Sequence, residues 1–219
     1  MPQSISDNPI FCRQLTTGLE RLGFSPEKER EQKLLRYLEL LIRWNKTYNL
    51  TAITDPETMI YRHLLDSLAV ARHIKGRRFV DIGSGAGLPG IPLAIWQADN
   101  SFVLLDSNGK KTRFLVQAKL ELGLNNVEVI HSRVENYQPE ARFDGILTRA
   151  FSSLADMVLC SEHLLLKTGV YYAMKGRLDQ QELSALPKAY TLRATRELDI
   201  PGGVEQRHLL ELISTEQNQ

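Results

Sequence analysis

The chain has 219 residues, of which 42% are hydrophobic and 24% charged, and its formal net charge is +1. These values are ordinary for a globular protein, and such a small net charge gives no sign of a nucleic-acid partner. No apolar run reaches the roughly 18 residues of a membrane span, and the first nine residues do not resemble a secretory signal. Two cysteines without metal spacing, Cys12 and Cys160, indicate a reducing compartment, so we expect a cytoplasmic protein with no metal site and no membrane partner.

Residues 1–75 are predicted to form an N-terminal helical extension. Ser25 is a good N-cap, and Pro26 follows at the first helical position. A second start signal at Asp55 predicts another helix that runs to about Ile74.

Two segments of this extension have open interpretations. The polar and aromatic segment 44–51 is either a connector or part of a substrate surface. Between Arg62 and Arg78, five basic residues accompany one acid, Asp66, which gives a local charge of +4. This stretch is either a solvated helix face or a patch that contacts phosphates.

From residue 78 onward, predicted strands and helices alternate, which favours a mostly parallel sheet with helices on both faces. The last two strands have no helix between them, so we expect the final strand to run antiparallel. Residues 76–219 are therefore predicted to be a Rossmann-like α/β domain with a seven-stranded sheet. The predicted strands are 78–82, 101–105, 127–130, 143–148, 168–174, 189–198 and 206–214, and the helices are 88–98, 108–122, 152–165 and 177–186.

The first of these strands ends in a run of glycines that includes Gly83 and Gly85. Glycine lets the chain turn sharply and lets a ligand contact bare main chain. Asp106 ends the second strand, 23 residues after Gly83, where a carboxylate can bind ribose hydroxyls. An isolated glycine run is more often a tight turn, and Asp106 could instead cap the next helix. The order of strand, glycines, helix and acid nevertheless favours a nucleotide site.

The glycine run is compatible with two cofactors. Gly85, Gly87 and Gly90 match the dinucleotide fingerprint, in which free N–H groups at a helix start bind a pyrophosphate. Pro89 and Pro92 lie at that helix start and have no N–H to donate. S-adenosyl-L-methionine has no phosphate, so the sequence favours a class I S-adenosylmethionine-dependent methyltransferase domain over an NAD-dependent dehydrogenase.

Ligands of open α/β sheets bind beyond the carboxyl ends of the strands, so residues there are candidates for the site. Leu88 borders the glycine loop and either lines the pocket or packs in the core. Residues 132–135, which include Val134 and Glu135, either meet the adenine edge or form a solvated loop. Phe151 either stacks on a substrate base or is buried. The remaining candidates at these ends are Gly83, Gly85, Asp106, Arg149 and Lys175.

Residues at the end of the fourth predicted strand limit which kind of atom can accept the methyl group. Residues 148–151 lack the Asn/Asp-Pro-Pro-aromatic motif of enzymes that methylate exocyclic amines, and neither cysteine lies at a strand end. A ring nitrogen such as guanine N7 has an in-plane lone pair and no proton to lose. Such an acceptor needs no general base and no nucleophile, so no catalytic residue is assigned; the sequence permits N7 without singling it out.

Six segments together resemble the ribosomal RNA small subunit methyltransferase G family, also called glucose-inhibited division protein B. The likeness extends from about residue 15 to residue 214. The segments are WNKTYNLT (44–51), RHLLDSL (62–68), VDIGSGAGLPGIP (80–92), LDSNGKK (105–111), TRAF (148–151) and RHLL (207–210).

This resemblance implies methyl transfer from S-adenosyl-L-methionine to N7 of one guanine in 16S rRNA near the decoding region. The implied partner is 16S rRNA or a small ribosomal subunit particle, and we expect a monomer. An RNA-binding module without catalysis is the remaining alternative. By the same resemblance, Gly83, Leu88, Val134, Glu135 and Arg149 contact the cofactor, Asp106 matches the family's acid, and an RNA-facing rim comprises Asn49, His63, Lys110, Arg149, Lys175 and Arg207.

Overall fold

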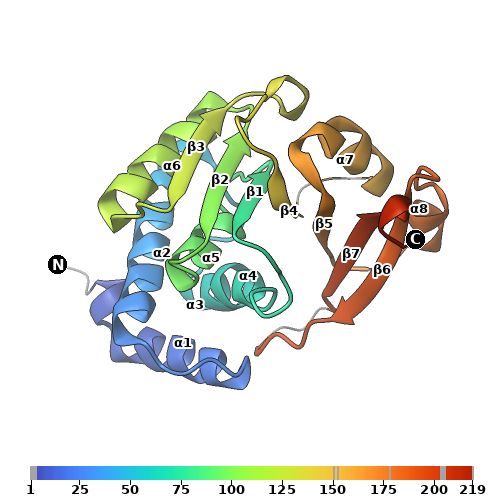
Figure 1. Cartoon of the computed structure of the whole chain (residues 1–219). Helices are drawn as coiled ribbons and strands as arrows, with labels where there is room; N and C mark the ends of the chain where they lie inside the picture. Colours follow the sequence, from blue (N-terminus) through green and yellow to red (C-terminus); the bar gives the residue numbers. More distant parts are fainter. Residues whose placement is uncertain (1–3, 150, 152, 178, 203–205, 219) are drawn as a thin grey trace.

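The computed structural model describes residues 4–149, 151, 153–177, 179–202 and 206–218. Its centre is a seven-stranded sheet in the order β3-β2-β1-β4-β5-β7-β6 (Figure 1). β7 runs antiparallel to both neighbours and the other adjacent pairs are parallel, as the sequence predicts. The strands are β1 (Arg78–Ile82), β2 (Ser101–Asp106), β3 (Val127–His131), β4 (Phe143–Thr148), β5 (Leu165–Lys175), β6 (Tyr190–Glu197) and β7 (His208–Ser214).

The helices lie on both faces of this sheet. The α-helices are α1 (Pro9–Arg21), α2 (Lys28–Tyr48), α3 (Pro56–Met59), α4 (Asp66–Leu68), α5 (Gly90–Trp96), α6 (Gly109–Leu122), α7 (Leu154–Ser161) and α8 (Gln180–Ser184). Ile60–Leu65 forms a π-helical segment, η2, and short 3-10 turns are η1 (Ile5–Asp7), η3 (Val134–Asn136), η4 (Glu162–Leu164) and η5 (Thr215–Asn218). None of the helices in the described ranges is both long and apolar enough to cross a bilayer.

Alternation along the strands builds two cores. Phe79 and Phe102 point to one face, where their rings stack 5.4 Å apart and meet the helices from α1 to α6. Val80 and Ile82 point to the other face and pack against α7. Burying each of these large side chains contributes about 1.5–3 kcal/mol, which fixes the register and therefore the height at which each strand ends.

The N-terminal helices share the first of these cores. Leu34 and Leu38 on α2 belong to the same buried cluster as Phe79 on β1. Gly18 on α1 lies so close to η2 that a Cβ atom there would overlap the side chain of Leu65. The division into 1–75 and 76–219 stays a prediction, but the two parts pack tightly against each other (Figure 1).

Two predicted helix ends were wrong. The second helix begins at Lys28, and its N-cap is Glu27 rather than Ser25. The Glu31 carboxylate accepts the Glu27 N–H at 2.9 Å, and this bond fixes the start. The helix predicted to reach Ile74 ends at Leu68. Residues 69–73 form turns, in which the Ala71 N–H donates to the carbonyl of Leu68 and the His73 N–H to that of Val70.

Candidate functional site

The glycine loop presents bare main chain at the carboxyl end of β1. Gly83 and Gly85 have φ angles of +68° and +60°, a conformation that glycine adopts without the penalty of a Cβ atom. The N–H of Gly83 donates to the carbonyl of Leu105 at 2.8 Å, which ties the loop to the end of β2. Gly83 is exposed, so a ligand can lie directly against its backbone.

Asp106 is held beside this loop. Its Oδ2 accepts the Gly85 N–H at 2.9 Å, its Oδ1 accepts the Asn108 N–H at 2.8 Å, and the residue is buried. The alternative that Asp106 caps the next helix is wrong, because Asn108 caps α6 by accepting the Lys110 N–H. The carboxylate oxygens retain further lone pairs, which fit the hydroxyls of a ribose.

The start of α5 is unsuited to a pyrophosphate. Pro89 is its N-cap, Pro92 lies in its first turn, and the N–H of Gly90 donates to Asp81 Oδ2 at 3.0 Å. The donors that would bind a phosphate are therefore missing or already used by the protein.

A cavity of about 210 Å³ opens between these strand ends. Val134 and Glu135 from η3 line it together with Phe151, while Leu88 packs against the core instead. The site therefore brings together five of the predicted residues around one cavity. The lining residues are Ile82, Gly83, Leu105, Asp106, Ser107, Ser132, Arg133, Val134, Glu135 and Phe151.

Two buried residues support the loop from beneath. Tyr37 on α2 donates its hydroxyl to the carbonyl of Ala86 at 2.6 Å and is fully buried. In the sequence Tyr37 is one more apolar position of an amphipathic helix, so nothing there marks it as part of the site. Asp81 is 1% exposed, and burial raises its pKa to about 7 against the lowering effects of the Gly90 N–H and the Arg149 charge.

The raised pKa of Asp81 predicts a pH-dependent stability. Between pH 3.8, the usual pKa of this carboxyl, and about pH 7, the folded state holds the Asp81 proton more tightly than the unfolded state. The contribution of Asp81 to the free energy of unfolding therefore falls as pH rises. This contribution to the free energy of unfolding changes by up to about 1.4 kcal/mol per pH unit. We expect Asp81→Asn to become increasingly stable relative to wild type from pH 4 to pH 7, with no further gain above, measured by urea unfolding.

The comparison with Asp81→Asn is needed because His63 changes the stability with pH in the opposite direction. Burial lowers the pKa of His63 to about 4, so its contribution is lost as pH falls from 6.5 toward 4. A constant stability difference between wild type and Asp81→Asn across this range would contradict the assignment.

Arg149 and Arg207 meet at a single buried carboxylate. Arg149 follows β4, and its Nη2 lies 3.2 Å from Asp66 Oδ2. Arg207 precedes β7, and its Nε donates to Asp66 Oδ1 at 3.0 Å. Asp66 lies in the RHLLDSL segment (62–68), but nothing in the sequence indicates that it pairs with these two arginines.

The other predicted rim residues differ in accessibility. His63 is buried, and its Nε2 lies 3.0 Å from Thr51 Oγ1, so at neutral pH it is an uncharged group under the surface. Asn49 is exposed at the end of α2 and lines a cavity of about 490 Å³ together with Thr51. Segment 44–51 is therefore partly helical, and its end forms a surface next to His63.

Lys110 and Lys175 are held in different ways. Lys110 is exposed in the first turn of α6. Lys175 donates to the carbonyl of Phe151 at 3.0 Å and pairs with Glu182 at 2.7 Å. Lys175 thus holds the backbone carbonyl of Phe151.

The basic stretch between Arg62 and Arg78 does not form one patch at the site. Arg62 lies on η2 near the site, whereas Arg78 lies at the start of β1, the opposite end of the sheet, where its guanidinium covers the Phe143 ring at 4.8 Å. Arg72 covers the Phe24 ring at 5.2 Å. These contacts favour a structural role for the later part of the stretch.

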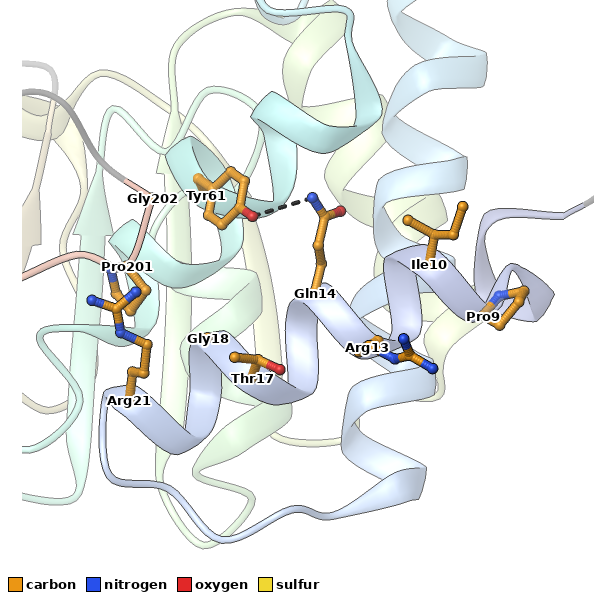
Figure 2. Close-up of a pocket in the computed structure, with 10 residues that line it drawn as sticks. All are labelled: Pro9, Ile10, Arg13, Gln14, Thr17, Gly18, Arg21, Tyr61, Pro201 and Gly202. Carbon is orange, nitrogen blue, oxygen red and sulfur yellow. Dashed lines mark hydrogen bonds between the residues drawn. The ribbon is translucent and has the colours of Figure 1, made fainter.

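A separate cavity of about 450 Å³ lies between α1, Tyr61 of η2 and residues 201–202 (Figure 2). Gln14 on α1 donates to the Tyr61 hydroxyl at 3.1 Å across one wall. This cavity shares no lining residue with the one at the glycine loop, so the two are distinct.

Two solved structures show the class of fold to which this architecture belongs. A methyltransferase from Thiobacillus denitrificans, solved with S-adenosyl-L-homocysteine, matches with a TM-score of 0.52 at 14% identity, over 82% of this chain and 98% of that chain. TrmK from M. capricolum, with the same product bound, matches with a TM-score of 0.53 at 15% identity, over 68% and 67%. The exposed glycine backbone, the Asp106 carboxylate and the absence of a phosphate cradle fit S-adenosyl-L-methionine. The fold is that of the class I S-adenosylmethionine-dependent methyltransferases.

Sequence comparisons give the family. The family model for rRNA small subunit methyltransferase G matches residues 30–210. Proteins named ribosomal RNA small subunit methyltransferase G are 48% identical in Shewanella amazonensis and 46% identical in Shewanella baltica, over 93% of this chain and 99% of each relative. The chain belongs to the rRNA small subunit methyltransferase G family.

Proposed function

We propose that this enzyme transfers the methyl group of S-adenosyl-L-methionine to N7 of one guanine in 16S rRNA near the decoding region. The substrate is 16S rRNA, free or in a small-subunit particle. Membership of the family carries the choice of ribosomal RNA. The chemistry at the end of β4 favours the ring nitrogen.

Two other methylation reactions, at a pyrimidine carbon and at an exocyclic amine, fit the residues of this protein less well. Cys160 is half-buried on α7, where burial raises the pKa of its thiol to about 11, so it is a poor nucleophile for attack on a pyrimidine. Cys12 lies on α1, and its Sγ contacts the carbonyl of Ser6 at 3.4 Å. The β4 end carries Thr148 and Arg149 in place of the acceptors that an exocyclic amine requires.

Methylation of guanine N7 requires neither a general base nor a nucleophile from the protein. Its lone pair lies in the ring plane, so the protein mainly has to align the base with the methyl donor. Alignment of this kind supplies about 7–11 kcal/mol of the barrier. The bound cofactor supplies the methyl group from a positively charged sulfur. Asp106, Glu135 and the backbone of Gly83 would hold it, because these groups line the cavity at the strand ends.

We assign Phe151 and Arg149 to the entry of the base, because both follow the end of β4. Phe151 forms part of the cavity wall, and Lys175 fixes its carbonyl. A face of the ring offered to a purine would contribute about 1–3 kcal/mol by stacking. We assign Asn49, Lys110 and Arg207 to the RNA-facing rim.

The test is methyl transfer to identified atoms. The protein is incubated with labelled S-adenosyl-L-methionine and either free 16S rRNA or small-subunit particles, and nucleosides are identified by mass spectrometry. We expect label in 7-methylguanosine at one position and loss of that nucleoside in cells without the gene. Label on another atom would refute the N7 assignment, and RNA binding without transfer would favour the binding-module alternative.

We also propose that the enzyme acts as a monomer in the cytoplasm. Both cysteines are unpaired, as expected in a reducing compartment. Sedimentation equilibrium at micromolar concentration checks the first part, and a dimer mass would contradict it.

A further inference from the structure

Asp66 lies at the first position of α4 with its side chain only 3% exposed. Its two oxygens face two guanidinium groups, Arg149 on Oδ2 and Arg207 on Oδ1. When a buried carboxylate pairs with two cationic groups, the loss of one of the three groups leaves the charges of the other two without full neutralisation.

The two arginines come from different parts of the site. Arg149 follows the end of β4, and its charge acts on Asp81 and Tyr37, the two groups beneath the glycine loop. Arg207 reaches over the turn after β5, where a Cβ atom on Gly176 would lie 2.9 Å from its Nη1. One arginine therefore acts electrostatically on the groups beneath the glycine loop, and the other belongs to the rim assigned to RNA.

The segment around Asp66 offers Arg149 two further acceptors. The carbonyl of Arg62 on η2 accepts from Nη2 at 3.4 Å, and Ser67 Oγ accepts from Nη1 at 3.5 Å. Three acceptors on one helical segment restrict the guanidinium to one orientation. The N-terminal extension thereby sets the position of a side chain that comes from the sheet.

We propose that Asp66 is a positioning residue that couples the cofactor site to the RNA rim by holding Arg149 and Arg207 on one carboxylate. The proposal rests on the proposed function for the roles of the two arginines. Without the carboxylate, two half-buried like charges repel each other and turn toward solvent. Both ligands would then meet a less ordered site.

The first test is Asp66→Asn in the full chain. Calorimetry is expected to show an affinity for S-adenosyl-L-methionine about tenfold weaker, and filter binding a similar loss for 16S rRNA. In turnover the loss should appear as a higher KM for both ligands. A purely structural role would lower the amount of active enzyme, and hence kcat, instead.

Glu211 on β7 provides a matched control. It is also buried and holds two arginines, Arg193 at 2.6 Å and Arg196 at 2.5 Å, but both of these arginines lie on the edge strand β6. Glu211→Gln should destabilise the protein comparably and leave both affinities within about twofold of wild type.

A second variant tests the coupling even if Asp66→Asn does not fold. Arg207→Gln removes the RNA-side partner only, yet it should weaken cofactor binding about threefold through Asp66, whereas Arg193→Gln should not. Unchanged cofactor affinity in Arg207→Gln, unchanged affinities in folded Asp66→Asn, or an equal loss in Glu211→Gln would each overturn the proposal. Calorimetry with the cofactor remains readable even if the N7 assignment fails.

Discussion

Gly85→Asp is expected to lower the affinity for S-adenosyl-L-methionine by about 100-fold, or roughly 2.8 kcal/mol, while the protein stays folded. A Cβ atom at Gly85 meets no protein atom closer than the Gly83 carbonyl at 3.8 Å, so the new side chain has room in the absence of a ligand. It would occupy the ligand's contact surface and bring a second carboxylate next to Asp106. Calorimetry measures the effect directly.

Gly123→Asp is the control for backbone strain. Gly123 also has a left-handed conformation, with φ +64°, and no atom lies within 4 Å of its Cβ position. Both substitutions should cost about 1 kcal/mol in stability, because a side chain is disfavoured at positive φ. If Gly123→Asp weakened cofactor binding as much as Gly85→Asp, the loop would not be the cofactor site.

Asp106→Ala is expected to weaken cofactor binding by about 10–100-fold, since it removes the acceptor for ribose and releases the Gly85 N–H that shapes the loop. The Asn108 N–H loses its partner as well, and we expect a stability loss of about 1–3 kcal/mol. Isothermal calorimetry and urea unfolding on the same preparation separate the two effects.

Asp144→Ala provides the comparison. Asp144 Oδ2 accepts two backbone N–H groups, those of Arg77 at 2.8 Å and Arg78 at 2.9 Å, at the opposite end of the sheet. Its loss should destabilise the fold by a similar amount and leave cofactor affinity unchanged. Equal binding losses in the two variants would mean that Asp106 acts only by supporting the structure.

These experiments address a site to which the N-terminal helices contribute directly. Tyr37 holds the Ala86 carbonyl, His63 lies beneath the rim, and Asp66 fixes the two arginines. The first 75 residues therefore do more than cover one face of the sheet. They supply the donor and the acceptors that orient groups from the glycine loop and the strand ends.

The sequence alone determined the sheet and predicted the edge of the sheet at which the cofactor binds. The predicted strands match all seven observed strands to within a few residues, because a strand buried on both faces must present apolar side chains to two cores. The glycines after β1 and the acid after β2 marked the binding edge, because few residue types can take those positions beside a ligand.

Only the tertiary structure decided which polar groups meet. Glu27 rather than Ser25 caps α2 because Glu31 reaches back to it, and the partly buried Leu88 packs against the core. Asp66 and Arg207 are 141 residues apart in the chain, and no local pattern encodes such a contact. Local preferences fix the strands and turns, whereas buried charges choose their partners only after packing has removed water and left few groups within reach.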